Sequence, residues 1–340
     1  MTAIERRFGP GGAVALALAA IYLIWGSTYL AIRFAIETLP PFTMAGVRFL
    51  VAGSILFVWA RSRGAAAPRR EHWRPSMVIG ALLLLAGNGG VVWAESRIPS
   101  GIAALLVAIE PVWIAAFAPW VLGHRRAGPR AAVGLVAGIL GVAVLVINPH
   151  GLDPSSVDAA GAAVVVFGSM AWALGSLYSI RAALPESRAL ASGMQMLSGG
   201  LLLVVFGGAL GEWGRLGAGA PSLRSLLALA YLVVFGSIVA YSAYAFLLRA
   251  ARPTLSATYA FVNPIVAVLL GWLVAKEPLN WRVGAAAVLI LTGVILLILE
   301  GGRGQGSRRR SPDLAPMTTD DALVAAGEPP TACLALDAEV

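Results

Sequence analysis

Charge and cysteine are both scarce in this chain of 340 residues. Only 12% of the residues are charged, against about 25% in ordinary soluble domains, and 59% are hydrophobic. The mean hydropathy is +0.81, which makes a soluble globular domain the least favoured class. Cys333 is the single cysteine, so an intrachain disulfide and a metal site built from several cysteines are both excluded.

Lysine and histidine are almost absent as well. Lys276 is the one lysine, and the three histidines fall in separate predicted loops, so they form no cluster of metal ligands in the sequence. The chain has no Gly-Lys phosphate-binding motif, so we predict no ATP-driven step, no metal and no cofactor. The arginines punctuate apolar runs, which is typical of membrane loops and not of a basic surface that binds nucleic acid.

What the chain does have is long apolar runs. A hydropathy window of about 19 residues predicts an all-α polytopic membrane protein with ten transmembrane helices. Prolines and glycines mark the breaks between most of them. The predicted spans are 13–36, 42–60, 76–95, 99–122, 130–147, 159–181, 188–210, 224–248, 254–275 and 282–300.

The basic residues also predict an orientation. Alternate loops and the two termini hold 18 basic residues on one side of the membrane and 5 on the other. Because cytoplasmic loops are enriched in arginine and lysine, both termini are expected in the cytoplasm, as an even number of spans requires. Residues 1–12 would then be a cytoplasmic N-terminus, 149–158 a periplasmic linker, and 301–340 a disordered cytoplasmic tail without apolar periodicity.

The two groups of five spans resemble each other, which predicts an internal duplication over residues 13–148 and 159–300. Matching residues recur at a nearly constant offset of 147 to 153 positions. Five is an odd number, so the second half must be inverted relative to the first, as in secondary transporters. The matches are Gly26, Ser27 and Tyr29 with Gly175, Ser176 and Tyr178; Gly46, Leu50 and Gly53 with Gly193, Leu197 and Gly200; Glu110-Pro111 with Asn263-Pro264; and Gly141-Val142 with Gly293-Val294.

Both halves contain short motifs that combine small, aromatic and proline residues. They are IWGSTY (24–29), PP (40–41), AGVRF (45–49), AE (94–95), PSGIAA (99–104), WALGS (172–176), FGS (235–237) and SATYAFVNP (256–264). Together these motifs resemble those of the drug/metabolite transporter superfamily, and within it the EamA-domain exporters, closest to the YedA-like inner-membrane branch. The similarity runs from about residue 13 to residue 300.

This resemblance implies two EamA repeats, a cavity between them, and export of amino acids, nucleosides, drugs or organic cations across the cell inner membrane. It also implies an acid in the loop after the fourth span of each half. Glu277 fits that pattern in the second half, whereas His124 stands at the corresponding place in the first.

Glu110 is the single acid placed deep in a predicted span. A carboxyl group there is costly unless it is protonated or faces a cavity, so Glu110 is the candidate for proton coupling or cation recognition. The alternative is a structural ion pair, for instance with Arg48. Pro111 and Pro264 interrupt the backbone hydrogen bonds of their helices and are the predicted helix breaks.

Arg48 lies too deep in the second span to reach the membrane surface easily. We expect a structural partner for it, either Glu37, Glu110 or backbone carbonyls, with binding of a substrate carboxylate as the alternative. The remaining candidates could line a substrate cavity, or they could be packing and interfacial residues. They are Trp25, Ser27, Tyr29, Asn88, Trp172, Ser176, Tyr178, Tyr241, Tyr259 and Asn263.

The function predicted from these features is secondary-active export of small molecules by alternating access, with proton coupling left open. Partners would be the substrate and the lipid bilayer. An importer, an exchanger or a lipid flippase of the same fold is the alternative. An intramembrane enzyme is disfavoured because no aspartate or histidine falls within a predicted span.

Overall fold

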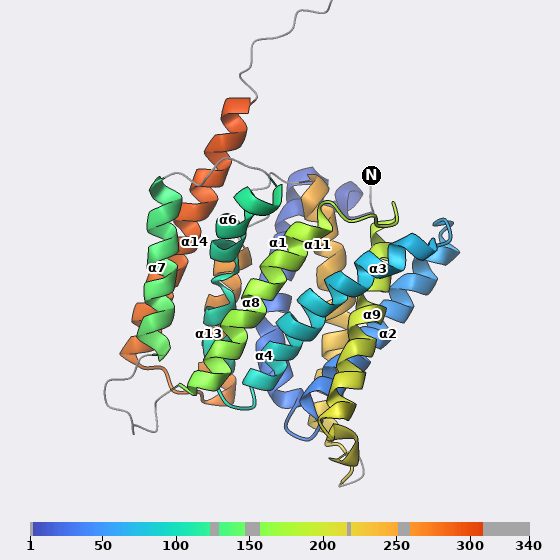
Figure 1. The fold of residues 1–340 in the computed structure, drawn as a ribbon, viewed down its shortest axis with the longest axis horizontal. Helices are drawn as coiled ribbons and strands as arrows, with labels where there is room; N and C mark the ends of the chain where they lie inside the picture. Colours follow the sequence, from blue (N-terminus) through green and yellow to red (C-terminus); the bar gives the residue numbers. More distant parts are fainter. Residues whose placement is uncertain (1–2, 123–128, 147–156, 216–218, 251–258, 309–340) are drawn as a thin grey trace, which may run out of the picture. The chain divides into compact units, whose positions relative to one another are not determined.

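The protein is all-helical over the residues that its computed structural model describes, which are 3–122, 129–146, 157–215, 219–250 and 259–308. The described residues up to 302 form one compact helical unit (Figure 1). The first half holds α1 (Ala3–Ala35), α2 (Pro41–Ser62), α3 (Arg70–Ile79), η1 (Gly80–Asn88), α4 (Gly89–Ala94), α5 (Ser100–Val107), α6 (Glu110–Leu122) and α7 (Pro129–Val146). The second holds α8 (Ala159–Ser179), α9 (Arg188–Ala209), η2 (Glu212–Arg215), α10 (Leu223–Tyr231), η3 (Leu232–Val239), α11 (Ala240–Ala250), α13 (Tyr259–Ala275) and α14 (Trp281–Arg308).

The ten predicted spans all correspond to helices. Seven stretches are long and apolar enough to cross a membrane, the third being Arg70–Ala94 and the fourth Ser100–Val121. Shorter apolar helices occupy the fifth, ninth and tenth positions, so the predicted fold class is confirmed. α14 continues as helix to Arg308, eight residues past the expected end of its span and into the predicted tail. Most of the predicted tail, and His124 and the linker up to residue 156, lie outside the described residues.

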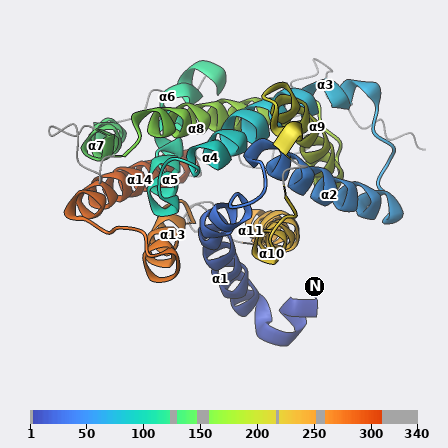
Figure 2. The same cartoon turned by 90° about the horizontal axis from the view of Figure 1, so that it is seen from below.

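The packing of the helices follows the inverted repeat. α1 packs against α13 and against α10 and α11, while α8, at the corresponding place in the other half, packs against α5 and α6 and against η1. Seen from below, α6, α8, α4 and α9 lie along one side of this unit, and α1, α10, α11 and α13 lie along the other (Figure 2). Each first helix of a repeat therefore packs mainly on helices of the opposite half.

Glycines allow α2 and α9 to approach each other closely. A Cβ on Gly46 would lie 2.9 Å from the backbone oxygen of Gly200, and a Cβ on Gly53 would lie 3.0 Å from that of Gly193. Because Gly46 is equivalent to Gly193 and Gly53 to Gly200 in the predicted duplication, the two contacts are related by the pseudo-twofold symmetry. The contact is the small-residue packing expected between membrane helices.

Glycines also allow close packing between the fifth and tenth spans. A Cβ on Gly293 of α14 would lie 3.0 Å from the backbone nitrogen of Gly138 in α7, and one on Gly141 would lie 3.1 Å from that of Ile290. Gly284, nearer the start of α14, takes no part in this contact. Nothing lies within 4 Å of a Cβ built on Gly284, because the residue is on an exposed side of α14.

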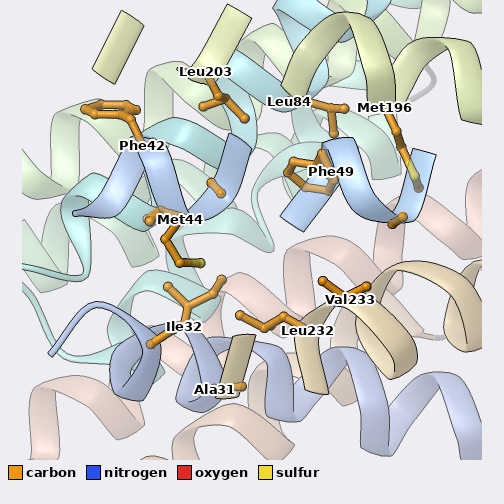
Figure 3. Packing of buried hydrophobic residues seen from close by; sticks show 14 of the residues in the cluster. Ala31, Ile32, Phe42, Met44, Phe49, Leu84, Met196, Leu203, Leu232 and Val233 are labelled. Carbon is orange, nitrogen blue, oxygen red and sulfur yellow. The ribbon is translucent and has the colours of Figure 1, made fainter. Parts of the chain in front are cut away.

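The largest cluster of buried apolar side chains surrounds α2. Phe42, Met44 and Phe49 of α2 lie between Leu203 and Met196 of α9 on one side and Ile32 of α1 with Leu232 and Val233 of η3 on the other (Figure 3). Helix α2 thus joins both halves. It begins with Pro41, whose fixed φ suits the first helical position.

Glu212 caps the N-terminus of α2 from the other half of the chain. Its Oε1 accepts from the Phe42 backbone N–H at 3.2 Å, and its Oε2 accepts from the backbone N–H and the hydroxyl of Thr43, both at 2.8 Å. The carboxylate is buried, so it satisfies donors that water does not reach.

We expect Glu212→Ala to lower the free energy of unfolding by about 1–3 kcal/mol, because it leaves these buried donors unpaired. The measurement is thermal unfolding of the purified protein in detergent. The control is Glu37→Ala, which removes an exposed acid 3.2 Å from Arg224 and should cost no more than about 1 kcal/mol. Equal destabilisation by both variants would contradict the capping role.

Candidate functional site

The fourth span is broken near its middle. α5 ends at Val107, Ala108 and Ile109 form a turn, and α6 begins at Glu110. Pro111 has no N–H to donate, and the N–H of Val112 instead bonds to the carbonyl of Ile109 at 2.9 Å. The predicted helix break therefore occurs directly before the predicted carboxylate, in a segment where irregular backbone is tolerated only inside the protein or beside a cavity.

An aromatic cluster of the two halves lies near this break. The rings of Trp25 (α1), Tyr244 (α11) and Tyr259 (α13) are in mutual contact, with centroids 5.2 to 5.6 Å apart. The Trp25 indole N–H donates to the Gly236 carbonyl at 3.3 Å, which fixes the ring against η3. Glu110 is close enough to Tyr244, Tyr259 and Tyr29 for its charge to act on all three. Of the predicted candidates, the structure thus groups Trp25, Tyr29 and Tyr259 with Glu110.

Asn263 extends this group on the ninth span. It is 8% exposed, and its side-chain Oδ1 has no hydrogen-bond partner among the described residues. Its backbone oxygen lies 3.2 Å from the position of a Cβ on Gly26, so α1 and α13 are in close contact here. Pro264 follows within α13, whose helix continues through it.

Arg48 is buried, as predicted, but its partner is not an acid. Its Nε donates to the Ser237 hydroxyl at 3.0 Å, and Ser237 in turn donates to the Leu232 carbonyl at 3.1 Å. In the part of the chain that the structure describes, no carboxylate forms an ion pair with Arg48, so the expected pairing with Glu37 or Glu110 is wrong. The physical reason is that Arg48 points at η3, where a hydroxyl and backbone are within reach, while Glu37 pairs with Arg224.

The third and eighth spans share a feature that the sequence did not reveal. Each widens into a π-helix near its middle, η1 over Gly80–Asn88 and η3 over Leu232–Val239. Gly87-Asn88 and Gly236-Ser237 are equivalent at an offset of 149 residues and lie in these segments. π-Helical segments are rare and often occur at functional sites.

The candidates on α8 form a separate group. A Cβ on Gly87 would lie 2.8 Å from the Trp172 ring, so Trp172 packs on η1 as Trp25 packs on η3. Ser176 and Asn88 are partly buried, and Tyr178 is 38% exposed. Among the described residues, no ring contact or side-chain hydrogen bond joins this group to the aromatic cluster.

Two further candidates are committed to hydrogen bonds between helices. The Ser27 hydroxyl lies 2.6 Å from the Tyr231 hydroxyl and also donates to the Ile24 carbonyl at 2.9 Å. The Tyr241 and Ser192 hydroxyls are hydrogen-bonded to each other, and Tyr241 packs against the core around α2. Both pairs connect the eighth span to a neighbouring helix.

Two glutamates near the span ends were not chosen as site residues from the sequence. Glu277 caps the N-terminus of α5, since it accepts from the backbone N–H groups of Ser100 at 2.8 Å and Gly101 at 3.1 Å. Glu95, directly after α4, is fully buried although the sequence places it at a membrane boundary. The sequence shows that Glu95 lies beside the PSGIAA motif. It does not show that Glu95 is buried, because that burial depends on helices far away in the sequence.

Comparisons with known proteins agree with this architecture. The profile of the EamA-like transporter family matches the chain twice, over residues 12–147 and 159–299. The chain is 39% identical over 305 residues to the "Uncharacterized inner membrane transporter YedA" of Escherichia coli, covering 89% of this chain and 95% of that one. It is 24% identical to the "Uncharacterized transporter YvbV" of Bacillus subtilis, covering 85% of this chain and 92% of that one.

A solved structure supports the fold alone. The chain matches a protein described as "Crystal structure of protein" with a TM-score of 0.58 and 20% identity, over 86% of this chain and 98% of that one. Because the family profile covers both halves and the relatives are named transporters, the predicted resemblance is confirmed. The chain belongs to the EamA-like transporter family and is a membrane transporter.

Proposed function

We propose that this protein is a secondary-active exporter of small metabolites or drugs that works by alternating access. The observation that carries the proposal is the break in the fourth span, which places the charge of Glu110 within electrostatic reach of Tyr244 and Tyr259, whose rings contact Trp25. A carboxylate and a broken helix from one half thereby lie against aromatic side chains of both halves. In inverted-repeat transporters, the substrate site lies at this kind of interface near the midplane.

Glu110 is the group that couples transport to protons in this proposal. It is partly exposed and its charge acts on Tyr244 and Tyr259 of the aromatic cluster, so it can exchange a proton or a cationic substrate. Asn263, with its unpartnered oxygen, is the neutral counterpart from the second half. Glu110 and Asn263 both present hydrogen-bond acceptors. Substrates with ammonium or amide N–H groups, such as amino acids, nucleosides or organic cations, carry the complementary donors.

The location and orientation complete the proposal. The protein lies in the inner membrane, where the name of the relative YedA places that protein. Both termini face the cytoplasm, because basic residues are 18 to 5 in favour of that side. The turns after α4 and α13 then face the periplasm.

A ligand screen tests the proposed function. We expect at least one amino acid, nucleoside, polyamine or aromatic cation to raise the thermal stability of the purified protein. A ligand at 100 times its Kd adds about 2.7 kcal/mol to the free energy of unfolding. Screening at about pH 5.5 and about pH 7.5 brackets the range in which tuned carboxyl groups titrate, and Glu110→Gln should remove any pH dependence of the ligand effect. Stabilisation by phospholipids alone would contradict the small-molecule proposal and favour a flippase.

A further inference from the structure

A second buried carboxyl group lies at one end of the bundle, in the turn between α4 and α5. Glu95 is 0% exposed, and neither of its carboxyl oxygens has a hydrogen-bond partner among the described residues. The hydroxyl of Ser100, at the start of α5, is likewise buried and without a partner in that part of the chain. Three unpaired polar atoms therefore lie within six residues of sequence, where packing alone would place apolar groups.

The charged groups around Glu95 come from three elements. Arg33 of α1 donates from Nη1 to the backbone oxygen of Glu95 at 2.6 Å, and the charge of Glu277, in the turn after α13, acts on the Glu95 carboxyl group. Glu277 already accepts from two backbone N–H groups of α5. On the turn of Glu95 itself, Arg97 stacks on the Trp93 ring and lies 3.9 Å from Asp158. None of these groups makes a hydrogen bond or ion pair with the Glu95 carboxyl.

This environment favours the protonated form of Glu95. Burial raises the pKa of the carboxyl well above its ordinary value, Glu277 raises it further, and Arg33 opposes them. An ionised carboxylate without donors would lose its hydration and gain no hydrogen bond in return. A neutral carboxyl group carries its own donor and is much less costly to bury.

Tyr29 connects this carboxyl group to the midspan site. Both Glu95 and Glu110 are near enough to the Tyr29 phenol for their charges to act on it. Tyr29 lies on α1 and packs against the buried apolar cluster that includes Ala94 and Ile98, on either side of Glu95, and side chains of α5. Its hydroxyl can accept one proton while it donates another, so it can relay a proton between two carboxyl groups.

We propose that Glu95 is a second proton-binding site, which exchanges a proton with Glu110 through Tyr29 and connects the midspan site to this end of the bundle. The step conserves protons: Tyr29 accepts the proton of Glu110 and passes its own hydroxyl proton to an ionised Glu95. Glu110 is left as a carboxylate and Glu95 as a carboxylic acid. The inference rests on the proposed function, because it takes Glu110 as the coupling group.

Infrared spectroscopy of the purified protein without substrate tests the site directly, since protonated and ionised carboxyl groups absorb at separate frequencies. We expect a protonated-carboxyl band at about pH 7, where an ordinary glutamate is ionised. In the background of Glu110→Gln, which removes the other proton-binding carboxyl group of the account, the band should be lost in Glu95→Gln and unaffected in the exposed control Glu37→Gln. If Glu95→Gln fails to fold, Glu95→Asp should retain the band. A spectrum unchanged by Glu95→Gln would overturn the proposal. The proposal would also be overturned if Na⁺, but not choline, removed the wild-type band, because Glu95 would then bind a metal cation in place of a proton.

The stability of the protein against pH gives an independent readout. The folded state holds a proton on Glu95 that the unfolded state releases at lower pH, so the unfolding free energy should fall as pH rises above about 4.3. Glu95→Gln cannot release a proton and should show a flatter profile over the same range. Parallel profiles for wild type and Glu95→Gln would contradict a proton held by Glu95.

The relay is tested by following the Glu110 carboxyl after a rapid pH jump. Tyr29→Phe keeps the ring but removes the hydroxyl, and should slow the exchange at Glu110 by at least about tenfold. An unchanged rate would overturn the relay through Tyr29. The coupling role of Glu110 and the proton-binding role of Glu95 can fail independently. If Glu110 does not titrate, proton coupling is refuted. The infrared band of Glu95 reports on Glu95 alone.

Discussion

Replacement of Glu110 by glutamine should abolish gradient-driven transport while leaving the protein folded. Glutamine has nearly the same shape as glutamate but cannot take up a proton or carry charge, and Glu110 is the first residue of α6 beside the helix break. Non-driven exchange of substrate should survive, because the aromatic cluster of Trp25, Tyr244 and Tyr259 is left intact. The measurement compares uptake into proteoliposomes with and without a pH gradient, using the first ligand that stabilises the purified protein.

Two further variants separate coupling from structure. Glu71→Gln alters an exposed acid in α3 and should leave both activities unchanged. Glu110→Ala removes the side chain and should also abolish driven transport. If Glu110→Gln and Glu110→Ala both reduce the amount of folded protein to the same extent, Glu110 is a structural residue and the coupling role is wrong.

Gly46→Ala should destabilise the protein by about 1–3 kcal/mol, which is the usual cost of overpacking a close-packed interior. The new Cβ would lie 2.9 Å from both the Gly200 oxygen and the Val204 nitrogen, which are backbone atoms and cannot rotate away. Helices α2 and α9 would have to separate, and this contact joins the two halves. The measurement is the unfolding free energy in detergent.

Gly284→Ala is the matched control. Gly284 lies in helix α14 with nothing within 4 Å of its Cβ position, so the substitution meets no atom. It should be neutral or stabilise by up to about 1 kcal/mol, because alanine has the higher helix propensity. If Gly46→Ala and Gly284→Ala changed the unfolding free energy equally, α2 and α9 would not be packed closely enough for a Cβ to clash.

The arrangement of spans was predictable because hydropathy alone sets where a chain enters the bilayer. The repeat was predictable as well, because its glycines recur at a constant offset in the sequence. The contact between α2 and α9 is formed by these same glycines, which are Gly46, Gly53, Gly193 and Gly200. The break before Glu110 followed from Pro111, which cannot donate a backbone hydrogen bond. The roles assigned to the site residues remain predictions.

The partners of the charged side chains could not be predicted, because they depend on which helices meet in space. Arg48 bonds to Ser237, which is 189 residues away in sequence, and neither hydropathy nor charge distinguishes that serine from others. Glu212 and Glu277 cap helices of the opposite half in the same manner. Glu95 is the last residue of the predicted span 76–95, and its burial depends on helices that are distant in sequence.

The central claim is that a site between two inverted halves opens alternately to the two sides of the membrane. Ser27 and Ser176 occupy equivalent positions in the two halves, are partly buried, and can be replaced by cysteine with little change in volume. The measurement is labelling of Ser27→Cys and Ser176→Cys by a membrane-impermeant thiol reagent, in a Cys333→Ser background, in vesicles of both orientations. Ser62→Cys, on an exposed position at the end of α2, should label from one side and serves as the control. The account predicts that both cysteines, which lie on the first helix of each half, label from both sides, and that a stabilising ligand changes their labelling. Labelling of each from a single side, whatever the pH or ligand, would contradict alternating access.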